Sequence, residues 1–193
     1  MPKLEQKLSI TDMVYFANFI QHVDALRRKN MIDSQNWQQI IKTISTAQRA
    51  SMHCSIATVD QLGQPNITPI GTVFLKNNQT GFFFDTYSES FKENIPNNSK
   101  ACLQAVNIKR FFWLKSMILG KFSDFPGVRL NIEIGELRIA TAEELAMIEQ
   151  RIKPLSWTKG SQLIWSSFTH VRDFNVTGFK WVQYPTIMPN YEF

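Results

Sequence analysis

The stretch that decides the fold runs from Ala57 to Val106 and reads ATVDQLGQPNITPIGTVFLKNNQTGFFFDTYSESFKENIPNNSKACLQAV. Short apolar runs of β-forming residues alternate in it with the turn signals LGQ and KNNQTG. Together with HCSIATVD at its start, they predict four strands, over residues 53–60, 66–75, 81–86 and 100–107. Pro65 and Pro69 cannot donate ladder hydrogen bonds, so we expect the second strand to be bulged or partly at an edge.

Two amphipathic helices are expected before these strands, because apolar residues there recur at helical spacing. The helices are predicted over residues 10–29 and 34–46. They form an expected N-terminal helical extension, residues 1–48, in front of a second domain, residues 49–193. Nothing in these helices indicates chemistry, and packing or dimerisation is the role we expect for them.

The second half of the chain continues with short elements. An aromatic-rich helix or loop is expected over 109–120, and an alternating pattern predicts a half-buried strand over 128–139. Thr141 and Glu144 form a capping-box pattern for a helix over 142–153. The tail is expected to return to strands around 162–168 and 176–184. Short antiparallel strands with a few interposed helices predict an α+β protein built on a small barrel.

The composition is that of an ordinary globular protein, with 44% hydrophobic and 19% charged residues in 193. The net charge is +5, and the basic residues are scattered except for Arg27-Arg28-Lys29, which falls near an expected helix C-terminus. We therefore expect no nucleic-acid partner.

The two cysteines, Cys54 and Cys102, have no framework spacing and are expected to be reduced thiols of a cytoplasmic protein. The most apolar stretch, Phe111 to Leu119, is interrupted by Lys115 and is shorter than the ~20 residues that span a bilayer. No membrane partner is expected.

Hydroxyl groups and a lysine gather just after the third predicted strand. Thr86 ends that strand, and Ser88, Ser90 and Lys92 follow on the loop that leads into a short helix. Backbone N–H groups, hydroxyls and an ammonium group all favour a phosphate dianion. The structural alternative is a plain helix start, with Ser88 as the N-cap and Lys92 solvated.

This arrangement resembles the flavin-binding split barrel of the pyridoxamine 5'-phosphate oxidase-like superfamily. Oxidases of that kind show a strand ending in Thr, a Ser-Arg-Lys segment and an Asn-rich turn. Here Thr86, Ser90, Lys92 and Asn97-Asn98 occur in that order. The resemblance implies an antiparallel split β-barrel with interposed helices and an N-terminal helical extension. It also implies FMN as the cofactor, with Thr86, Ser90 and Lys92 at the flavin phosphate.

The second predicted strand carries the other half of the resemblance. The family's Arg-x-Val-Leu-Leu-Lys segment, which runs alongside the isoalloxazine ring, is Gly71-Thr72-Val73-Phe74-Leu75-Lys76 in this chain. The resemblance places Gly71, Thr72, Val73 and Lys76 at the cofactor. Lys76 is equally well explained as a turn lysine beside Asn77.

Two arginines of the family pattern are absent, since Gly71 and Phe91 stand in their places. Each lost charge-assisted bond costs roughly 1.5–3 kcal/mol. Either FMN binds more weakly or another cation compensates, for which the candidates are Arg129, Lys115 and Lys121, from the same chain or a dimer partner. Arg129 has an alternative role in a structural ion pair with Glu133 on the same strand face.

The pattern of a true pyridoxamine phosphate oxidase is incomplete. Trp181 leads into Val182-Gln183-Tyr184-Pro185 without the family's arginine, and its Arg-x-His clamp is replaced by His170-Val171-Arg172. Phe111, Phe112 and Trp113 could wall a pocket, although aromatic clusters usually form core. No metal-ligand spacing surrounds the histidines, and no side chain is identified as a catalytic acid or base.

We therefore expect an FMN-binding flavoprotein, an oxidoreductase if it is an enzyme, that acts as a homodimer on an unknown small-molecule substrate or reductant. The alternatives are a flavin-binding or sensing protein without turnover and a fold-mate that has lost its cofactor, because fold alone does not fix function.

Overall fold

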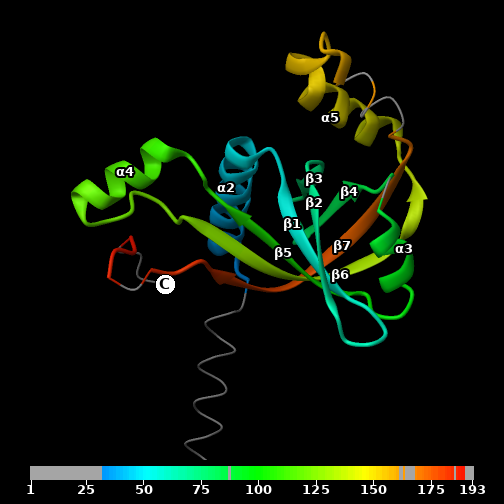
Figure 1. Ribbon diagram of the computed structural model, residues 1–193, viewed down its shortest axis with the longest axis horizontal. Helices are drawn as coiled ribbons and strands as arrows, with labels where there is room; N and C mark the ends of the chain where they lie inside the picture. The colour runs from blue at the N-terminus through cyan, green and yellow to red at the C-terminus, as the bar shows by residue number, and fades with distance from the viewer. Residues whose placement is uncertain (1–31, 87, 161–162, 164–167, 185, 190–193) are drawn as a thin grey trace, which may run out of the picture. The chain divides into compact units, whose positions relative to one another are not determined.

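The computed structural model describes residues 32–86, 88–160, 163, 168–184 and 186–189. The helix expected over residues 10–29 and most of the strand expected around 162–168 lie outside them. Seven antiparallel strands form one sheet in the order β2-β1-β5-β6-β7-β4-β3 (Figure 1). The strands are β1 Cys54–Val59, β2 Pro65–Ile70, β3 Val73–Leu75, β4 Thr80–Phe84, β5 Lys100–Val106, β6 Gly127–Ile139 and β7 His170–Trp181.

Four helices and one 3-10 turn accompany the sheet among the described residues. They are α2 Ser34–Ser51, α3 Glu89–Asn94, α4 Arg110–Leu119, α5 Ala142–Ile152 and η1 Lys153–Leu155. The expected α+β class is confirmed. So is the expected capping box, in which Thr141 Oγ1 accepts from Glu144 N–H and the Glu144 carboxylate accepts from Thr141 N–H.

The prediction of one strand over 66–75 was wrong, because the chain changes edge within it. β2 and β3 lie at opposite ends of the strand order and are joined only by Gly71 and Thr72. A link of two residues holds the Cα atoms of Ile70 and Val73 within about 11 Å. Seven strands laid flat would put the outer two about 29 Å apart. The sheet must therefore curl, and it forms the antiparallel half-barrel of a split barrel.

β2 is an edge strand, as its two prolines predicted. It pairs only with β1, where Pro65 lies opposite Val59 and Pro69 opposite Ser55. Most of its residues are exposed, Ile67 among them. The edge position explains how the strand accommodates two residues without an N–H group.

Two hydrophobic cores lie on the two faces of strand β4. Phe83 belongs to the larger core with residues of α2, β1, β5, β6 and β7, whereas Phe82 and Phe84 belong to a smaller core with Phe74, Val171 and Ile148 of α5. Neighbouring strand residues point to opposite faces, so the three consecutive phenylalanines divide between the cores. β4 is consequently buried on both sides.

Helix α2 is part of the larger core. Trp37, Ile40, Ile44 and Ala47 are buried in it, and the Trp37 indole N–H donates to Lys76 O at 3.0 Å. The helix starts at its cap Asp33, whose carboxylate accepts from Asn36 N–H at 2.7 Å, and runs past residue 48 to Ser51. It therefore continues through the expected domain boundary and packs with the sheet as one compact unit over Ile32–Phe193.

Helix α4 is set apart by its exposed apolar side chains. Phe112 and Trp113 pack with Phe122, and Trp113 also contacts Tyr184, so these aromatics form local core. The remaining large apolar residues of the helix are exposed, namely Phe111, Leu114, Met117, Ile118 and Leu119. Within the described residues, no helix combines the length and the hydropathy that crossing a membrane requires.

Candidate functional site

A pocket of about 340 Å³ opens where the two edges of the curled sheet meet. Its walls come from the end of β2 and the link after it, and from the end of β4 and the start of α3. The lining residues are 68–72, 84–86, Ser88 and Phe168. Three of the predicted cofactor residues, Gly71, Thr72 and Thr86, are thereby brought together, although the first two are fourteen or more positions from the third in sequence. We call this the edge pocket.

The edge pocket contains two buried polar atoms without a protein partner. Thr86 Oγ1 and Asp85 Oδ1 are both buried and make no hydrogen bond within the described part of the chain. The other oxygen of Asp85 accepts from Arg172 Nε at 2.6 Å in a buried ion pair, and Arg172 also donates to Gly135 O at 3.2 Å. Buried polar groups are normally satisfied. Both residues line the edge pocket, which makes these two atoms candidate partners for a polar ligand.

Thr72 fixes the floor of the edge pocket. Its hydroxyl donates to Phe84 O at 3.3 Å and accepts from Phe84 N–H at 3.1 Å. These bonds tie the link between the edge strands to the end of β4. The hydroxyl of Thr72 therefore has a structural role. The next residue, Val73, is buried in the larger core.

Gly71 lies beside a crowded stretch of backbone. A Cβ atom at this position would lie 3.0 Å from Met52 O, closer than ordinary van der Waals contact. Gly71 O accepts from Gln48 Nε2 at 2.8 Å and from Arg151 at 3.4 Å. Any side chain at this position, the family's arginine included, would need Met52 to shift by a few tenths of an ångström.

Of the two serines and the lysine that follow the third predicted strand, only Ser88 lines the edge pocket. Ser88 is the N-cap of α3 and accepts from Phe91 N–H at 3.3 Å, as the structural alternative predicted, and it also lines the edge pocket. Lys92 Nζ is exposed and pairs with Glu89 at 2.7 Å, which raises the pKa of Lys92 through hydrogen bonding and charge. Ser90 and Lys92 lie on α3 but do not line the pocket.

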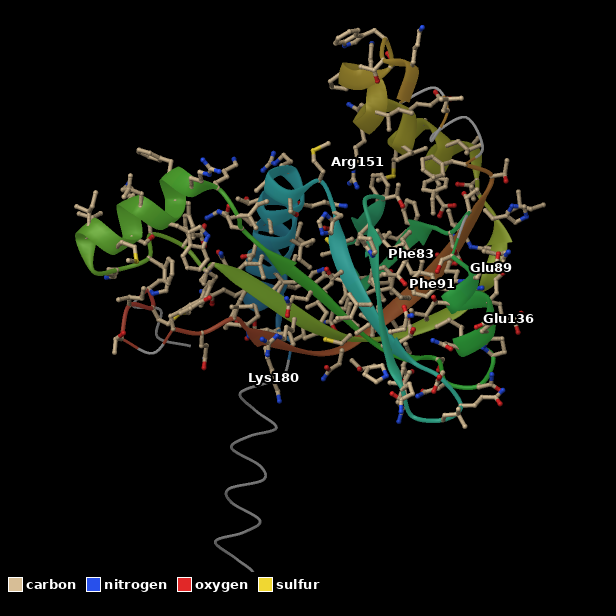
Figure 2. The ribbon with its side chains drawn as sticks, in the orientation of Figure 1. Phe83, Glu89, Phe91, Glu136, Arg151 and Lys180 are labelled. Atoms are coloured by element: carbon tan, nitrogen blue, oxygen red, sulfur yellow. The ribbon has the colours of Figure 1, made fainter. Side chains whose placement is uncertain are left out.

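Phe91, which stands where the family has an arginine, is a buried core residue. Its ring is fully buried and packs against Phe83, with ring centroids 5.2 Å apart (Figure 2). Glu89 lies on the outer side of the same helix in that view. The position therefore anchors α3 to the sheet and offers no group to a ligand.

Lys76 belongs to a cluster of charges away from the edge pocket. Its Nζ lies 3.7 Å from Glu144 and 3.9 Å from Asp173, and 5.1 Å from the centre of the Phe82 ring. Arg138 bridges the same two carboxylates, at 2.7 Å to each through NH2. Arg138 bonding lowers the pKa of Glu144 to about 2 and is the largest cause of that shift. Lys76 remains a predicted cofactor residue, but in this geometry it supports the contact of α5 with the sheet.

Arg129 lies on the exposed face of β6. Its Nε donates to Gln104 Oε1 of β5 at 2.9 Å. No ion pair joins it to Glu133 within the described residues, so the expected structural pair was wrong and the partner is a neutral amide across the strands. Arg129 does not line the edge pocket.

Sequence reasoning missed Asp85, Arg172 and Arg151. Asp85 is visible as the single charge in GFFFDT, directly before the predicted Thr86, but its partner Arg172 is far along the chain. Arg151 falls in the helix predicted over 142–153, where the pattern indicates no further role. No pattern in the sequence marks these distant pairings.

Neither cysteine is bonded, as expected. Burial raises the pKa of Cys54 to about 12, and it raises the pKa of Cys102 above its usual value. No group of three or more potential metal-ligating side chains occurs among the residues that the structure describes.

Comparisons with known proteins agree on the architecture. The family model described as "Pyridoxamine 5'-phosphate oxidase" matches residues 40–174. No curated protein matches the chain by sequence. An FMN-binding protein from Syntrophomonas wolfei subsp. wolfei is similar at 13% identity and a TM-score of 0.54, over 89% of this chain and 98% of that one.

Two further solved structures are similar with lower scores. HupZ from Group A Streptococcus gives 20% identity and a TM-score of 0.49, over 79% of this chain and 95% of that one. HutZ, the heme storage protein from Vibrio cholerae, gives 12% identity and a TM-score of 0.44, over 74% of this chain and 94% of that one. At these identities the likeness concerns the fold alone.

Proposed function

Because this chain belongs to the pyridoxamine 5'-phosphate oxidase family, we propose that it is an FMN-binding flavoprotein that serves as an oxidoreductase on a substrate other than pyridoxamine phosphate. The observation that carries the proposal is the edge pocket, in which Thr86 Oγ1 and Asp85 Oδ1 are buried without partners. When bound, FMN supplies the hydride or electron transfer, and the protein supplies orientation and access.

The residues of the edge pocket fit a flavin nucleotide by their chemistry. Thr86 and Ser88 offer hydroxyl donors to phosphate oxygens. Asp85 Oδ1 is a hydrogen-bond acceptor with negative charge. It can therefore accept from a ribityl hydroxyl of FMN, but it would repel the phosphate. The ion pair with Arg172 offsets the charge of Asp85, which keeps the pocket open to an anionic ligand.

Lys92 is the cation nearest in sequence to this group of hydroxyls. Its pair with Glu89 is exposed, and exposed ion pairs are screened by solvent and contribute little to stability. A phosphate dianion can therefore replace Glu89 as the partner at little cost. We assign Lys92 and Ser90 to the phosphate in the complex, with the lysine turning from Glu89.

The first experiment measures FMN and riboflavin binding by quenching of flavin fluorescence. We expect Thr86→Val to weaken FMN and to leave riboflavin nearly unchanged, since its hydroxyl is assigned to the phosphate that riboflavin lacks. Lys92→Ala is expected to weaken FMN about tenfold or more and leave riboflavin unchanged, because only FMN carries the phosphate. Lys180→Ala is the matched control, an exposed lysine of β7 that does not line the pocket (Figure 2).

Three outcomes decide between the alternatives. A colourless protein that takes up no FMN contradicts the proposal and favours a fold-mate without cofactor. Binding without bleaching by NADH, NADPH or other reductants favours a flavin-binding or sensing protein. Bleaching followed by reoxidation supports an oxidoreductase.

We also propose that the protein is a homodimer. The support is the stripe formed by Phe111, Leu114 and Ile118 on α4, spaced three and four residues apart and exposed together with Met117. Contiguous exposed apolar side chains are typical of protein contact surfaces.

A further inference from the structure

A second and larger cleft, of about 640 Å³, lies between the end of α2 and the inner side of α5. Its lining comes from three segments: Ser45, Gln48, Arg49 and Met52; Gly71, Thr72 and Phe74; and Met147, Ile148, residues 150–152 and Pro154. Its size is in the range of small-molecule sites. Gly71 and Thr72 line both this cleft and the edge pocket, which therefore adjoin across the link between the edge strands.

Among the residues that the structure describes, the ionisable side chains that line the cleft are Arg49 and Arg151, and none of the lining residues is acidic. Neither arginine forms an ion pair within the described residues. The cleft thus carries two positive charges and no counter-ion of its own, between walls that are largely apolar.

Arg151 is held in a fixed orientation. Its guanidinium carbon lies 3.5 Å from the centre of the Phe74 ring, and its NH1 donates to Val73 O at 2.8 Å. Figure 2 shows the side chain extending from α5 toward the sheet. The NH2 and Nε groups have no partner in the described part of the chain. A planar, oriented guanidinium with free donors is suited to a carboxylate or a phosphate.

Arg151 is exposed as a residue, but its guanidinium is partly desolvated where it stacks on Phe74. Burial lowers its pKa to about 10, and no carboxylate of the described residues compensates. An anion in the cleft would give the guanidinium the charged partner that it lacks among the described residues. Arg49, in the last turn of α2, can bind the same anion from the facing wall.

We propose that this cleft binds a small organic anion, with Arg151 and Arg49 holding a carboxylate or phosphate group and Phe74, Met52 and Met147 contacting an apolar body. The inference does not depend on the flavin, because the cleft has its own charges and its own walls. A ligand seated there would lie next to whatever occupies the edge pocket, across Gly71 and Thr72.

The test uses isothermal titration calorimetry with the full-length protein and three probes of one shape: 2-naphthoate, 2-naphthyl phosphate and uncharged 2-naphthol. We expect both anions to bind and naphthol to bind about tenfold or more weakly. The tighter of the two anions identifies the head group. Equal binding of naphthol and the anions would overturn the proposal.

Two variants and a control locate the site. Arg151→Gln and Arg49→Gln are each expected to weaken both anions, by about tenfold and severalfold. Arg110→Gln, an exposed arginine of α4 outside the cleft, should change nothing. Arg151 also donates to backbone carbonyls, so circular dichroism checks the folding of its variant. Arg49 makes no such bond within the described residues, so its variant keeps the test decisive. Affinities within twofold of wild type in both cleft variants contradict the site.

A final experiment tests whether anion binding in the cleft is independent of FMN binding. Anion binding that persists in protein saturated with FMN, or in protein that binds no FMN, supports an independent site. Loss of anion binding on saturation with FMN would show one shared site and overturn the inference.

Discussion

The carboxylate of Glu144 is the clearest single-residue determinant of stability, because it is buried and bonded twice by Arg138. We expect Glu144→Gln to lower the free energy of unfolding by about 3 kcal/mol at pH 7. The pKa of Glu144 is depressed from 4.5 to about 2 in the folded state. A depressed pKa stabilises above 4.5, and this contribution is lost as the pH falls from 4.5 toward 2.

The difference between variant and wild type should therefore be full at pH 7 and much smaller near pH 2.5. Urea unfolding at both pH values measures it. Glu143→Gln, exposed on the same helical turn, is the control that should show neither effect. An equal loss at both pH values would mean that the ion pair is not the cause.

Phe91 supplies a second prediction for a single residue. Restoring the family's arginine with Phe91→Arg should not improve FMN affinity, because the side chain would enter the core beside Phe83. We expect a loss of about 3 kcal/mol or more in unfolding free energy from the lost packing and the buried charge. Phe91→Leu, which keeps an apolar side chain, should cost about 1 kcal/mol. Tighter FMN binding by the arginine variant would contradict this.

Single residues of the site were predicted where a local motif marks them. Thr86 and Ser88 follow a strand in a recognisable order, and both line the edge pocket. The burial of Phe91 and the pairing of Lys92 with Glu89 depend on which way α3 faces, and spacing alone does not fix that. Arg172 joins Asp85 across 87 positions, a distance at which a single sequence gives no signal.

At the scale of elements, α4 differs from the other helices because most of its large apolar side chains are exposed in the single chain. Replacing Leu114 and Met117 together with Glu should leave the unfolding free energy nearly unchanged, because both side chains are exposed in the single chain. If these residues join two copies, the molar mass measured by light scattering should fall to that of one chain. Lys115→Glu on the same helix is the control and should not dissociate the pair.

A monomeric mass for the wild-type protein would contradict the homodimer outright. An unchanged dimeric mass in the variant would place the contact on another surface.

Elements were predictable wherever one face of the chain is buried. The alternation from Val128 to Ile139 gave β6 to within one residue, and the capping box gave the start of α5. The stretch from Asn66 to Leu75 is predicted as one strand because its apolar pattern hardly changes. Its division at Gly71 and Thr72 comes from the curl of the sheet, and that is not a local property.

For the described molecule as a whole, closure of the curled sheet depends on the link between its edges. We expect Thr72→Val to lower the unfolding free energy by about 1–3 kcal/mol, because both bonds to Phe84 are lost inside the protein. Thr72→Ser retains the hydroxyl and should lose less. Urea denaturation of the three proteins provides the comparison, and equal losses in both variants would assign the effect to the methyl group instead.

Only the hairpin pairs β1–β2 and β3–β4, joined by the turns LGQ and KNNQTG, could be read from the sequence, and the rest of the strand order could not. β1 lies between β2 and β5, and β7 between β6 and β4, so most neighbours are joined by long connections. The family resemblance supplied the split barrel, and periodicity supplied only its strands.

The prolines of β2 have a consequence for how copies of this protein can meet. Edge-to-edge pairing into fibrils requires a continuous row of backbone N–H donors along a free strand. Two of the six residues of β2 are prolines and have no N–H group. A foreign strand laid along this border could not complete its ladder. The prolines therefore disfavour polymerisation by backbone pairing along β2, even though Ile67 exposes an apolar side chain there.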